Sequence, residues 1–236
     1  MKIFAKIRFY WDAFLISFIV AVIMIPLLAL FPSKKGTTIH RLNLLIIFLI
    51  GGKLIQVGEA DPEADMILMN HQGIVDIIGM EALQTGHLRW IAKKELFDTP
   101  WFGHLLRKGD MISIDRENKT GLLKLIKDVK ESQTIKHRAV ALFPEGTRAD
   151  GQELLSFKSG AKFIAKKIGL KVQPVVITGS KYLLNEHNRT AHNSTVHYIY
   201  LPTIDVKNAP DDWYNTMKTS MQKVIDDELD HASRSR

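Results

Sequence analysis

The chain contains no cysteine in its 236 residues. This absence excludes disulfide bonds, zinc sites built on thiolates, and enzymes that use a cysteine nucleophile. The sequence also lacks internal repeats and low-complexity linkers, so one globular domain is the simplest expectation. No small-residue cleavage pattern follows its first apolar run, so a cleaved secretory signal peptide is not expected.

Acidic residues are fewer than basic ones, 25 against 32, which gives a net charge of +7 and a pI of about 9.5. This balance favours nucleic acid, anionic lipid or acidic proteins as partners. Nucleic acid is not expected among them, because the chain has no aromatic binding platform and no recognised nucleic-acid motif. Apolar residues make up 46% of the chain, which is enough to build a sizeable core.

The first part of the chain is unusually apolar. Residues 13–31 carry no charge, and a shorter apolar run follows at residues 42–50. The first run barely reaches the roughly 20 residues that a membrane span needs, and lysine or arginine flanks it on both sides. Residues 1–55 are therefore predicted to form an N-terminal membrane-anchoring segment of two helices that dips into one leaflet and returns. A single span and a buried core helix are the alternatives.

Residues 56–236 alternate between strand-like and helical patterns. This alternation predicts an α/β layered domain with a mixed, largely parallel central sheet flanked by helices. Residues 51–65 are expected to be a connection, and Pro174 is expected to mark an edge strand or a bulge. Strands are predicted at residues 66–69, 88–92, 110–115, 139–143, 172–179 and 196–201, and helices at residues 120–132, 157–170 and 210–229.

Polar residues follow the apolar run at residues 66–69, where a strand gives way to helical spacing. Asp76 is five positions after His71, which is about 140° around a regular helix. His71 is therefore expected in a turn eased by Gly73, with Asp76 in the first helical turn. A neutral imidazole beside a carboxylate is suited to take a proton from an alcohol. The alternative is an ordinary helix start, capped by Asn70 or Asp76.

A second polar turn, in the sequence FPEGTR, follows the predicted strand at residues 139–143. Gly146 permits a positive φ or a close backbone approach, and Arg148 offers a planar fork of donors suited to a phosphate. Arg116 follows a third predicted strand, in the sequence ISIDR. Ligands gather at strand ends in layered α/β folds, so His71, Arg116 and Arg148 are expected to share one pocket. Taken singly, each arginine is equally compatible with a solvated turn.

These stretches resemble the motifs of the glycerolipid acyltransferases. NHQGIVD matches that family's Asn-His-(four residues)-Asp signature, FPEGTR its glutamate-glycine block, and ISIDR and VQPVVI its arginine and proline blocks. Their order and spacing agree as well, so the resemblance covers about residues 66–201. Ser113 stands in the arginine block where many members have an aromatic or aliphatic residue. Within the family, the chain most resembles the bacterial lysophosphatidate acyltransferases.

The resemblance implies transfer of an acyl group from acyl-CoA or acyl carrier protein to the sn-2 hydroxyl of 1-acyl-sn-glycerol-3-phosphate, which yields phosphatidic acid. His71 and Asp76 would be the general base and its orienter, and no enzyme nucleophile is needed because the acceptor hydroxyl attacks directly. Neither a metal nor a cofactor is expected. The residues implied to bind the acceptor or shape its site are Lys93, Arg116, Glu145, Gly146 and Arg148.

The expected partners are lysophosphatidic acid, an acyl donor and membrane lipid, at the cytoplasmic face of a bacterial inner membrane. Two alternatives stay open. One is an acyltransferase for glycerol-3-phosphate or another lysophospholipid. The other is a non-catalytic membrane-binding protein of the same fold, in which the histidine is structural. A lysine stripe at Lys158, Lys162 and Lys166 is either a solvated face or a surface for anionic lipid or an acidic acyl carrier protein.

Overall fold

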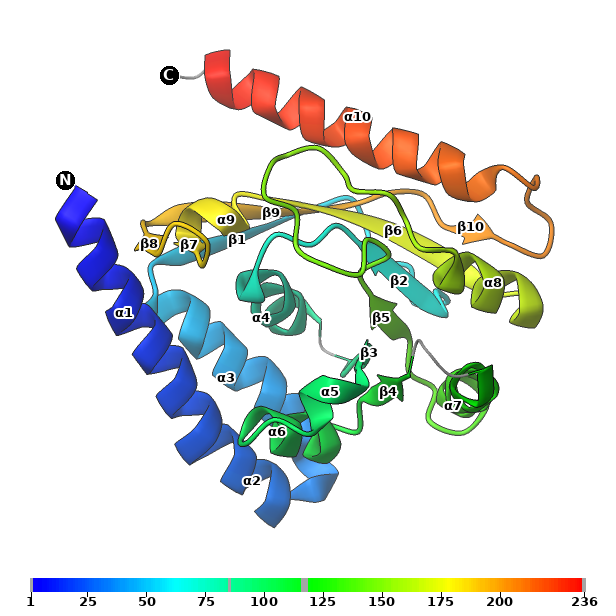
Figure 1. The fold of residues 1–236 in the computed structure, drawn as a ribbon, viewed down its shortest axis with the longest axis horizontal. Helices are drawn as coiled ribbons and strands as arrows, with labels where there is room; N and C mark the ends of the chain where they lie inside the picture. The colour runs from blue at the N-terminus through cyan, green and yellow to red at the C-terminus, as the bar shows by residue number, and fades with distance from the viewer. Residues whose placement is uncertain (1, 85, 116–118, 235–236) are drawn as a thin grey trace.

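The structure, a computed structural model, describes residues 2–84, 86–115 and 119–234. Within these residues an eight-stranded sheet has the order β1-β9-β6-β2-β5-β3-β4, with β10 paired to β6. Strands β6, β2, β5, β3 and β4 run parallel to one another, whereas β9 and β10 run antiparallel to β6. The mixed, largely parallel sheet predicted from the sequence is confirmed (Figure 1).

The strands of this sheet are β1 (Gly52–Val57), β2 (Met66–Met69), β3 (Arg89–Lys93), β4 (Ile112–Ile114), β5 (Val140–Leu142), β6 (Lys171–Thr178), β9 (Ser194–Tyr200) and β10 (Ile204–Asp205). A separate hairpin joins β7 (Leu184–Asn185) and β8 (Thr190–Ala191). The helices are α1 (Lys2–Phe18), a π-helical turn (Ile19–Met24), α2 (Ile25–Leu30), a 3-10 turn (Pro32–Lys34), α3 (Lys35–Leu49), α4 (Ile74–Leu83), α5 (Lys94–Phe97), α6 (Phe102–Lys108), α7 (Lys119–Thr134), α8 (Ser159–Ile168), α9 (Ser180–Leu183) and α10 (Trp213–Arg234).

Each face of the sheet has its own hydrophobic core, because successive strand residues point to opposite sides. In β2, Ile67 and Met69 join the core that the N-terminal helices and α4 cover. Met66 and Leu68 join the core that α7, α8 and α10 cover. Figure 1 shows α10 above the sheet and α1 to α4 below it. The sheet is therefore buried on both faces, as parallel sheets require.

The stretch from residue 51 to residue 65 is not only a connection, because Gly52–Val57 forms β1. This strand pairs in parallel with β9 along its whole length. It lies at the edge of the sheet, and its residues are half-buried or exposed, so it lacks the apolar run by which buried strands are recognised. The domain boundary predicted after residue 55 lies inside this strand.

The expectation that Pro174 marks an edge strand is wrong, whereas the alternative of a bulge agrees with the pairing, because three residues, 201–203, stand opposite residues 173 and 174 between the β9 and β10 pairs. Strand β6 lies in the sheet interior, and Pro174 stands opposite Leu68 in an unbroken register with β2. On its other side, Pro174 O accepts the N–H of Leu201 at 3.0 Å. The proline nitrogen faces that same side, between the end of β9 at Tyr200 and the start of β10 at Ile204. The missing N–H would face Leu201 O, and this oxygen instead accepts the side-chain amide of Gln173, with 3.4 Å from Nε2 to O.

The N-terminal segment consists of two helical arms packed against the α/β domain. The first arm is the continuous helix Lys2–Leu30, which is long and apolar enough to cross a membrane by length and composition. Near its start, Arg8 Nη2 donates to Ile50 O at 2.8 Å, and near its end Leu28 is buried where α2 meets α6. The second arm, α3, packs on α4. Both arms thus contribute to the core of the domain.

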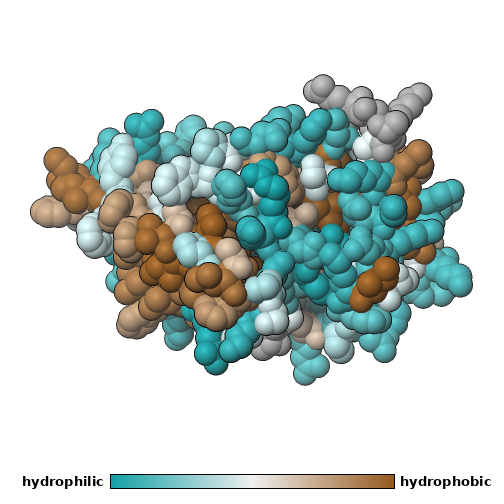
Figure 2. Space-filling model, turned by 90° about the horizontal axis from the view of Figure 1, so that it is seen from below, coloured by the Kyte–Doolittle hydropathy of each residue, from teal (hydrophilic) through white to brown (hydrophobic). Residues whose placement is uncertain are grey.

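A broad apolar surface covers the outer side of these two arms. Figure 2 shows it from below as a brown area that gives way to hydrophilic residues toward the other half of the molecule. A contiguous exposed apolar patch of this kind is typical of a membrane or protein contact. Its large exposed side chains include Ile3, Phe4, Ile7, Tyr10, Trp11, Phe14, Phe18, Val22 and Leu30 on the first arm and Leu44, Leu45, Phe48 and Leu49 on α3.

Candidate active site

The end of β2 is fixed to β6 by the side chain of Asn70. Its Nδ2 donates to Ile177 O at 2.8 Å, and its Oδ1 accepts the N–H of Ile177 at 2.7 Å. The buried amide therefore continues the ladder for one residue after β2 ends. The backbone then turns toward α4, which begins just after Gly73. His71 lies in this turn, at the carboxyl edge of the parallel strands.

His71 and Asp76 are in direct contact. The distance from His71 Nδ1 to Asp76 Oδ2 is 2.9 Å. The same carboxylate oxygen accepts the N–H groups of Gln72 at 2.6 Å and Gly73 at 2.8 Å, as an acidic residue in the first turn of a helix often does. Asp76 is fully buried, whereas the His71 ring is 13% exposed. Because Nδ1 faces Asp76, Nε2 is the ring nitrogen left to face a substrate.

Glu145 holds the histidine turn to the loop that follows β5. Its Oε1 accepts the N–H of His71 at 2.9 Å, and its Oε2 accepts the N–H of Leu155 at 2.8 Å. Burial raises the pKa of the Glu145 carboxyl, and the two N–H donors lower it by a smaller amount. Gly146 has a φ of +73°, a backbone conformation that favours glycine at this turn. Glu145 thus contacts the protein backbone with both carboxylate oxygens.

A half-buried phenylalanine, backed by a buried tryptophan, supports the His71 ring from its face. The ring of Phe143 is stacked on His71, with centroids 3.8 Å apart. Trp90 lies behind Phe143 at a centroid distance of 5.3 Å. Trp90 Nε1 in turn donates to the buried carboxylate of Glu81 at 2.6 Å. A fixed edge contact with Asp76 and a fixed face contact with Phe143 together restrict both position and rotation of the imidazole.

Arg148 forms an ion pair that joins the loop after β5 to the residue after β7. Its Nη1 lies 2.6 Å from Oε2 of Glu186, which follows the β7 strand. Glu186 Oε1 accepts the N–H of Ile74 at 3.3 Å, so the pair sits beside the start of α4. The next residue, Ala149, donates its N–H to His71 O at 2.9 Å. The structure therefore brings Arg148 next to the histidine turn, with its side chain 48% exposed.

Of the two remaining predicted cations, Lys93 lies farther along the same edge. Lys93 ends β3, which β5 separates from β2, and its exposed Nζ lies 3.6 Å from Oε1 of Glu95. Strand β4, next to β3, leads toward Arg116, which lies outside the described residues. The strand order thus places Lys93 at the carboxyl edge with His71 and Glu145, without a direct contact between Lys93 and His71.

The histidines between residues 187 and 197 have separate partners. His197 Nδ1 lies 2.8 Å from Glu228 Oε2, His187 Nδ1 lies 3.8 Å from Asp150 Oδ1, and the ring of His192 stacks on Tyr182. In the part of the chain that the structure describes, no group of three or more histidine, aspartate or glutamate residues is arranged to hold a metal ion.

Comparison with known proteins agrees with this geometry. A family model described as Acyltransferase matches residues 61–178, the segment from just before β2 to the end of β6. The chain is also 40% identical to the 1-acyl-sn-glycerol-3-phosphate acyltransferase of Helicobacter pylori (strain J99), over 74% of each chain. The chain belongs to the acyltransferase family.

More distant relatives of this acyltransferase extend the likeness. The chain is 28% identical to the 1-acyl-sn-glycerol-3-phosphate acyltransferase of Escherichia coli (strain K12), over 69% of this chain and 65% of that enzyme. The crystal structure of PlsC, the 1-acyl-sn-glycerophosphate (LPA) acyltransferase of Thermotoga maritima, superposes with a TM-score of 0.77. That superposition covers 99% of this chain and 98% of the other at 20% identity, and it shows that the two share one fold.

Several residues of the acyltransferase site escaped the sequence interpretation. Phe143 directly follows β5, and an aromatic residue there is ordinarily assigned to the core. Trp90 and Glu81 lie on β3 and α4, and no local spacing connects either to His71. Glu186 is 38 positions after Arg148 in the chain, so only the folded chain brings the two together. The one available signal was the aromatic residue that opens the FPEGTR sequence directly after a predicted strand.

Proposed function

We propose that this acyltransferase transfers a fatty acyl group from a thioester to the sn-2 hydroxyl of 1-acyl-sn-glycerol-3-phosphate and forms phosphatidic acid. The observation that carries the proposal is the contact between His71 and the buried carboxylate of Asp76 at the carboxyl edge of the sheet. The name of the Helicobacter pylori relative supports the choice of acceptor. Acyl-CoA and acyl carrier protein both supply the required thioester.

His71 acts as the general base in this proposal. Its Nε2 takes the proton of the acceptor hydroxyl while the hydroxyl oxygen attacks the thioester carbonyl carbon. The C–O bond forms, the C–S bond breaks, and the imidazolium returns the proton to the departing sulfur. The products are the ester and the free thiol. No covalent bond to the enzyme forms in this sequence of steps.

Asp76 fixes the tautomer and stabilises the imidazolium. Two backbone N–H groups and the His71 ring converge on one carboxylate oxygen, so the carboxylate is rigid before the substrate arrives. A carboxylate held in this way keeps the proton on Nδ1 and leaves Nε2 free to accept another. Glu145 contributes by holding the backbone of His71 in place rather than by reacting.

Cations along the carboxyl edge bind the phosphate of the acceptor. Arg148 is next to the histidine turn, and its pairing with Glu186 orients the guanidinium while leaving other N–H donors for a phosphate. Lys93 and Arg116 complete the proposed set. Each charge-assisted contact stabilises the bound phosphate by about 1.5–3 kcal/mol. Arg148→Lys is expected to raise KM for lysophosphatidic acid about tenfold, because the planar fork is lost.

The N-terminal arms associate with a membrane in this proposal. Their exposed apolar surface meets lipid, while contacts at Arg8 and Leu28 hold both ends of the first arm against the domain. A helix held along its length by a folded domain lies on a bilayer more readily than it crosses one. Because acyl-CoA and acyl carrier protein are cytosolic, the proposed location is the cytoplasmic face of a bacterial inner membrane.

The test is an acceptor and donor panel with the purified full chain. Palmitoyl-CoA and palmitoyl-acyl carrier protein are each offered with lysophosphatidic acid, glycerol-3-phosphate and lysophosphatidylcholine. Turnover is expected with lysophosphatidic acid, and a preference for either other acceptor would reassign the substrate. His71→Ala is expected to abolish turnover without unfolding, whereas His104→Ala, at an exposed position on α6, leaves it unchanged. Retained activity in His71→Ala would remove the assigned base.

A further inference from the structure

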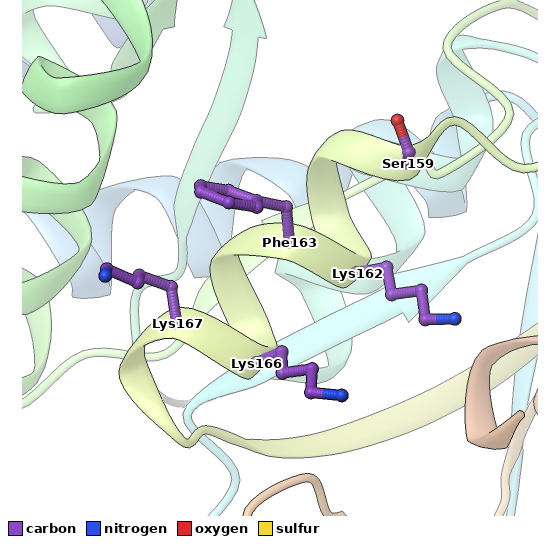
Figure 3. Close-up of a pocket in the computed structure, with 5 residues that line it drawn as sticks. All are labelled: Ser159, Lys162, Phe163, Lys166 and Lys167. Carbon is purple, nitrogen blue, oxygen red and sulfur yellow. The ribbon is translucent and has the colours of Figure 1, made fainter. Parts of the chain in front are cut away.

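The exposed face of α8 carries three lysines around one phenylalanine. Lys162, Phe163, Lys166 and Lys167 line a shallow, open pocket of about 480 Å³ together with Ser159 (Figure 3). Phe163 and Lys167 point to one side of the helix, and Lys162 and Lys166 point to the other (Figure 3). The charges therefore spread along the helix and do not converge on one point.

The residues on this exposed face of α8 do not pack in the hydrophobic core, so the stability of the fold does not explain them. The opposite face of α8 packs Ala161, Ile164 and Ala165 into the core shared with α7 and α10. Phe163, by contrast, is 46% exposed on the same side of the helix as Lys167. Among the described residues, Lys166 forms an ion pair with the carboxylate of Asp211, and both side chains of that pair are exposed. A basic surface with an apolar side chain at its centre is typical of a contact for an acidic partner.

The face lies close to the active site. Lys158, directly before α8, donates its backbone N–H to Pro144 O at 2.8 Å. Pro144 precedes Glu145, whose carboxylate accepts the N–H of His71. The helix begins beside this loop, and ten residues of α-helix span about 15 Å. A partner docked on α8 therefore sits within reach of His71 for a group carried on a long flexible arm.

The face is separate from the apolar surface of the N-terminal arms. Those arms cover one face of the sheet, and α8 covers the other. Figure 2 shows the broad apolar area on one part of the molecule and a mainly hydrophilic surface with smaller apolar spots beyond it. A bilayer in contact with the outer side of the first arm therefore leaves the α8 face open to the aqueous phase. This placement favours a soluble acidic protein over anionic lipid.

We propose that the exposed face of α8 docks an acidic acyl carrier protein, which delivers its acyl thioester to His71. This inference rests on the proposed function and names its donor. The diverging lysines suit an acidic surface of extended shape, whereas a single phosphate group of coenzyme A requires converging donors. Phe163 supplies an apolar anchor at the centre of the contact.

The test compares donors in matched variants of the full chain. Lys162→Glu/Lys167→Glu leaves the Lys166–Asp211 pair in place. It is expected to raise KM for palmitoyl-acyl carrier protein at least tenfold and to leave KM for palmitoyl-CoA unchanged. The control, Lys130→Glu/Lys223→Glu, makes the same charge change at exposed positions of α7 and α10 and is expected to change neither value. Phe163→Ala is expected to weaken the carrier-protein reaction alone.

Three outcomes would overturn the docking proposal. An unchanged KM for palmitoyl-acyl carrier protein shows that α8 is a solvated face. An equal loss with both donors shows that the lysines act on the site or on the coenzyme. A loss of binding to phosphatidylglycerol vesicles with unchanged donor kinetics assigns the face to lipid. Direct binding of palmitoyl-acyl carrier protein, measured by fluorescence anisotropy, tests the docking even if no acceptor is turned over. A failure of the proposed function can therefore be distinguished from a failure of the docking proposal.

Discussion

The imidazole of His71 lies parallel to the ring of Phe143, with an angle of 9° between the ring planes and 3.8 Å between their centroids. Asp76 contacts the same imidazole at its edge, through Nδ1. Two contacts at right angles leave the ring no free rotation. The orientation of Nε2 thus depends on an apolar residue that takes no part in proton transfer.

Replacing Phe143 by leucine tests this dependence. The substitution retains an apolar side chain but removes the stacked ring, which stabilises the observed orientation by about 0.5–1.5 kcal/mol. The expected result is a fall in kcat of about tenfold with KM for both substrates nearly unchanged, measured by steady-state kinetics. Phe157→Leu is the matched control, since Phe157 packs on Tyr214 away from the histidine turn. An equal loss in the control would mean that Phe143→Leu acts through stability.

Asp76→Asn is expected to lower kcat by about 10³–10⁴, because an amide next to Nδ1 no longer holds the proton there or stabilises the imidazolium. Steady-state rates with lysophosphatidic acid measure the loss, and circular dichroism checks that the variant is folded. Asp12→Asn provides a control at another buried carboxylate, one that pairs with Arg8 on α1. Activity of Asp76→Asn within tenfold of the wild type would show that the contact with His71 is structural.

Glu145 gives the stability of the protein a predictable pH dependence. Burial raises its pKa above the ordinary value of 4.5, so the folded chain binds this proton more tightly than the unfolded chain. The free energy of unfolding contributed by Glu145 is therefore greatest below the unfolded pKa and falls as pH rises through the folded pKa. In Glu145→Gln this titration is absent. Urea unfolding in detergent gives the free energy of unfolding of each protein. The value for the wild type minus the value for the variant should fall as pH rises above about 4.5. A flat or rising difference would contradict the assignment.

The sequence predicted most of the sheet because its interior strands are short apolar runs bounded by turn residues. It also predicted the contact between His71 and Asp76, since a turn followed by the first helical turn brings two residues five positions apart together. It did not predict β1, whose half-exposed residues form an edge strand, or the interior position of β6. Pro174 is tolerated there because the pairing of β6 passes from β9 to β10 at this point with one extra residue, and Gln173 donates to Leu201 O in place of the missing N–H. The position of Pro174 in the sheet depends on the order of the strands, and the local sequence pattern does not specify that order.

The same distinction applies to the site. Motif positions identified His71, Asp76 and the FPEGTR turn, but not which atoms Glu145 contacts. Its carboxylate accepts two backbone N–H groups, one of them from a residue 74 positions away. The pairing of Arg148 with Glu186 likewise joins two loops that only the folded sheet brings together. Residue types along the chain predict chemistry, whereas the partners of each side chain follow from tertiary packing.

The exposed face of α1 is expected to determine membrane binding. Trp11→Glu/Phe14→Glu places two charges where two aromatic side chains would enter lipid, and each buried aromatic contributes about 1.5–3 kcal/mol. Sedimentation with phospholipid vesicles should show binding reduced at least about a hundredfold. The control, Leu123→Glu/Ile135→Glu, changes two equally exposed apolar residues in and after α7 and should bind as the wild type does. Equal losses in the two variants would place the membrane contact elsewhere.

Cysteine labelling distinguishes an anchor in one leaflet from a helix that spans the bilayer. Because the chain has no cysteine of its own, single substitutions give a clean background. Lys6 and Lys34 are exposed positions at opposite ends of the first arm, and Lys223 is exposed on α10 of the α/β domain. If the arm lies in one leaflet, an impermeant maleimide should label Lys6→Cys, Lys34→Cys and Lys223→Cys from the same side of sealed vesicles. If the arm spans, Lys6→Cys and Lys34→Cys must react from opposite sides, because a helix of 29 residues is about 44 Å long and exceeds the hydrocarbon thickness of about 30 Å. Labelling from opposite sides would therefore replace the one-leaflet anchor with a span and require the contacts of Arg8 and Leu28 with the domain to break in the membrane.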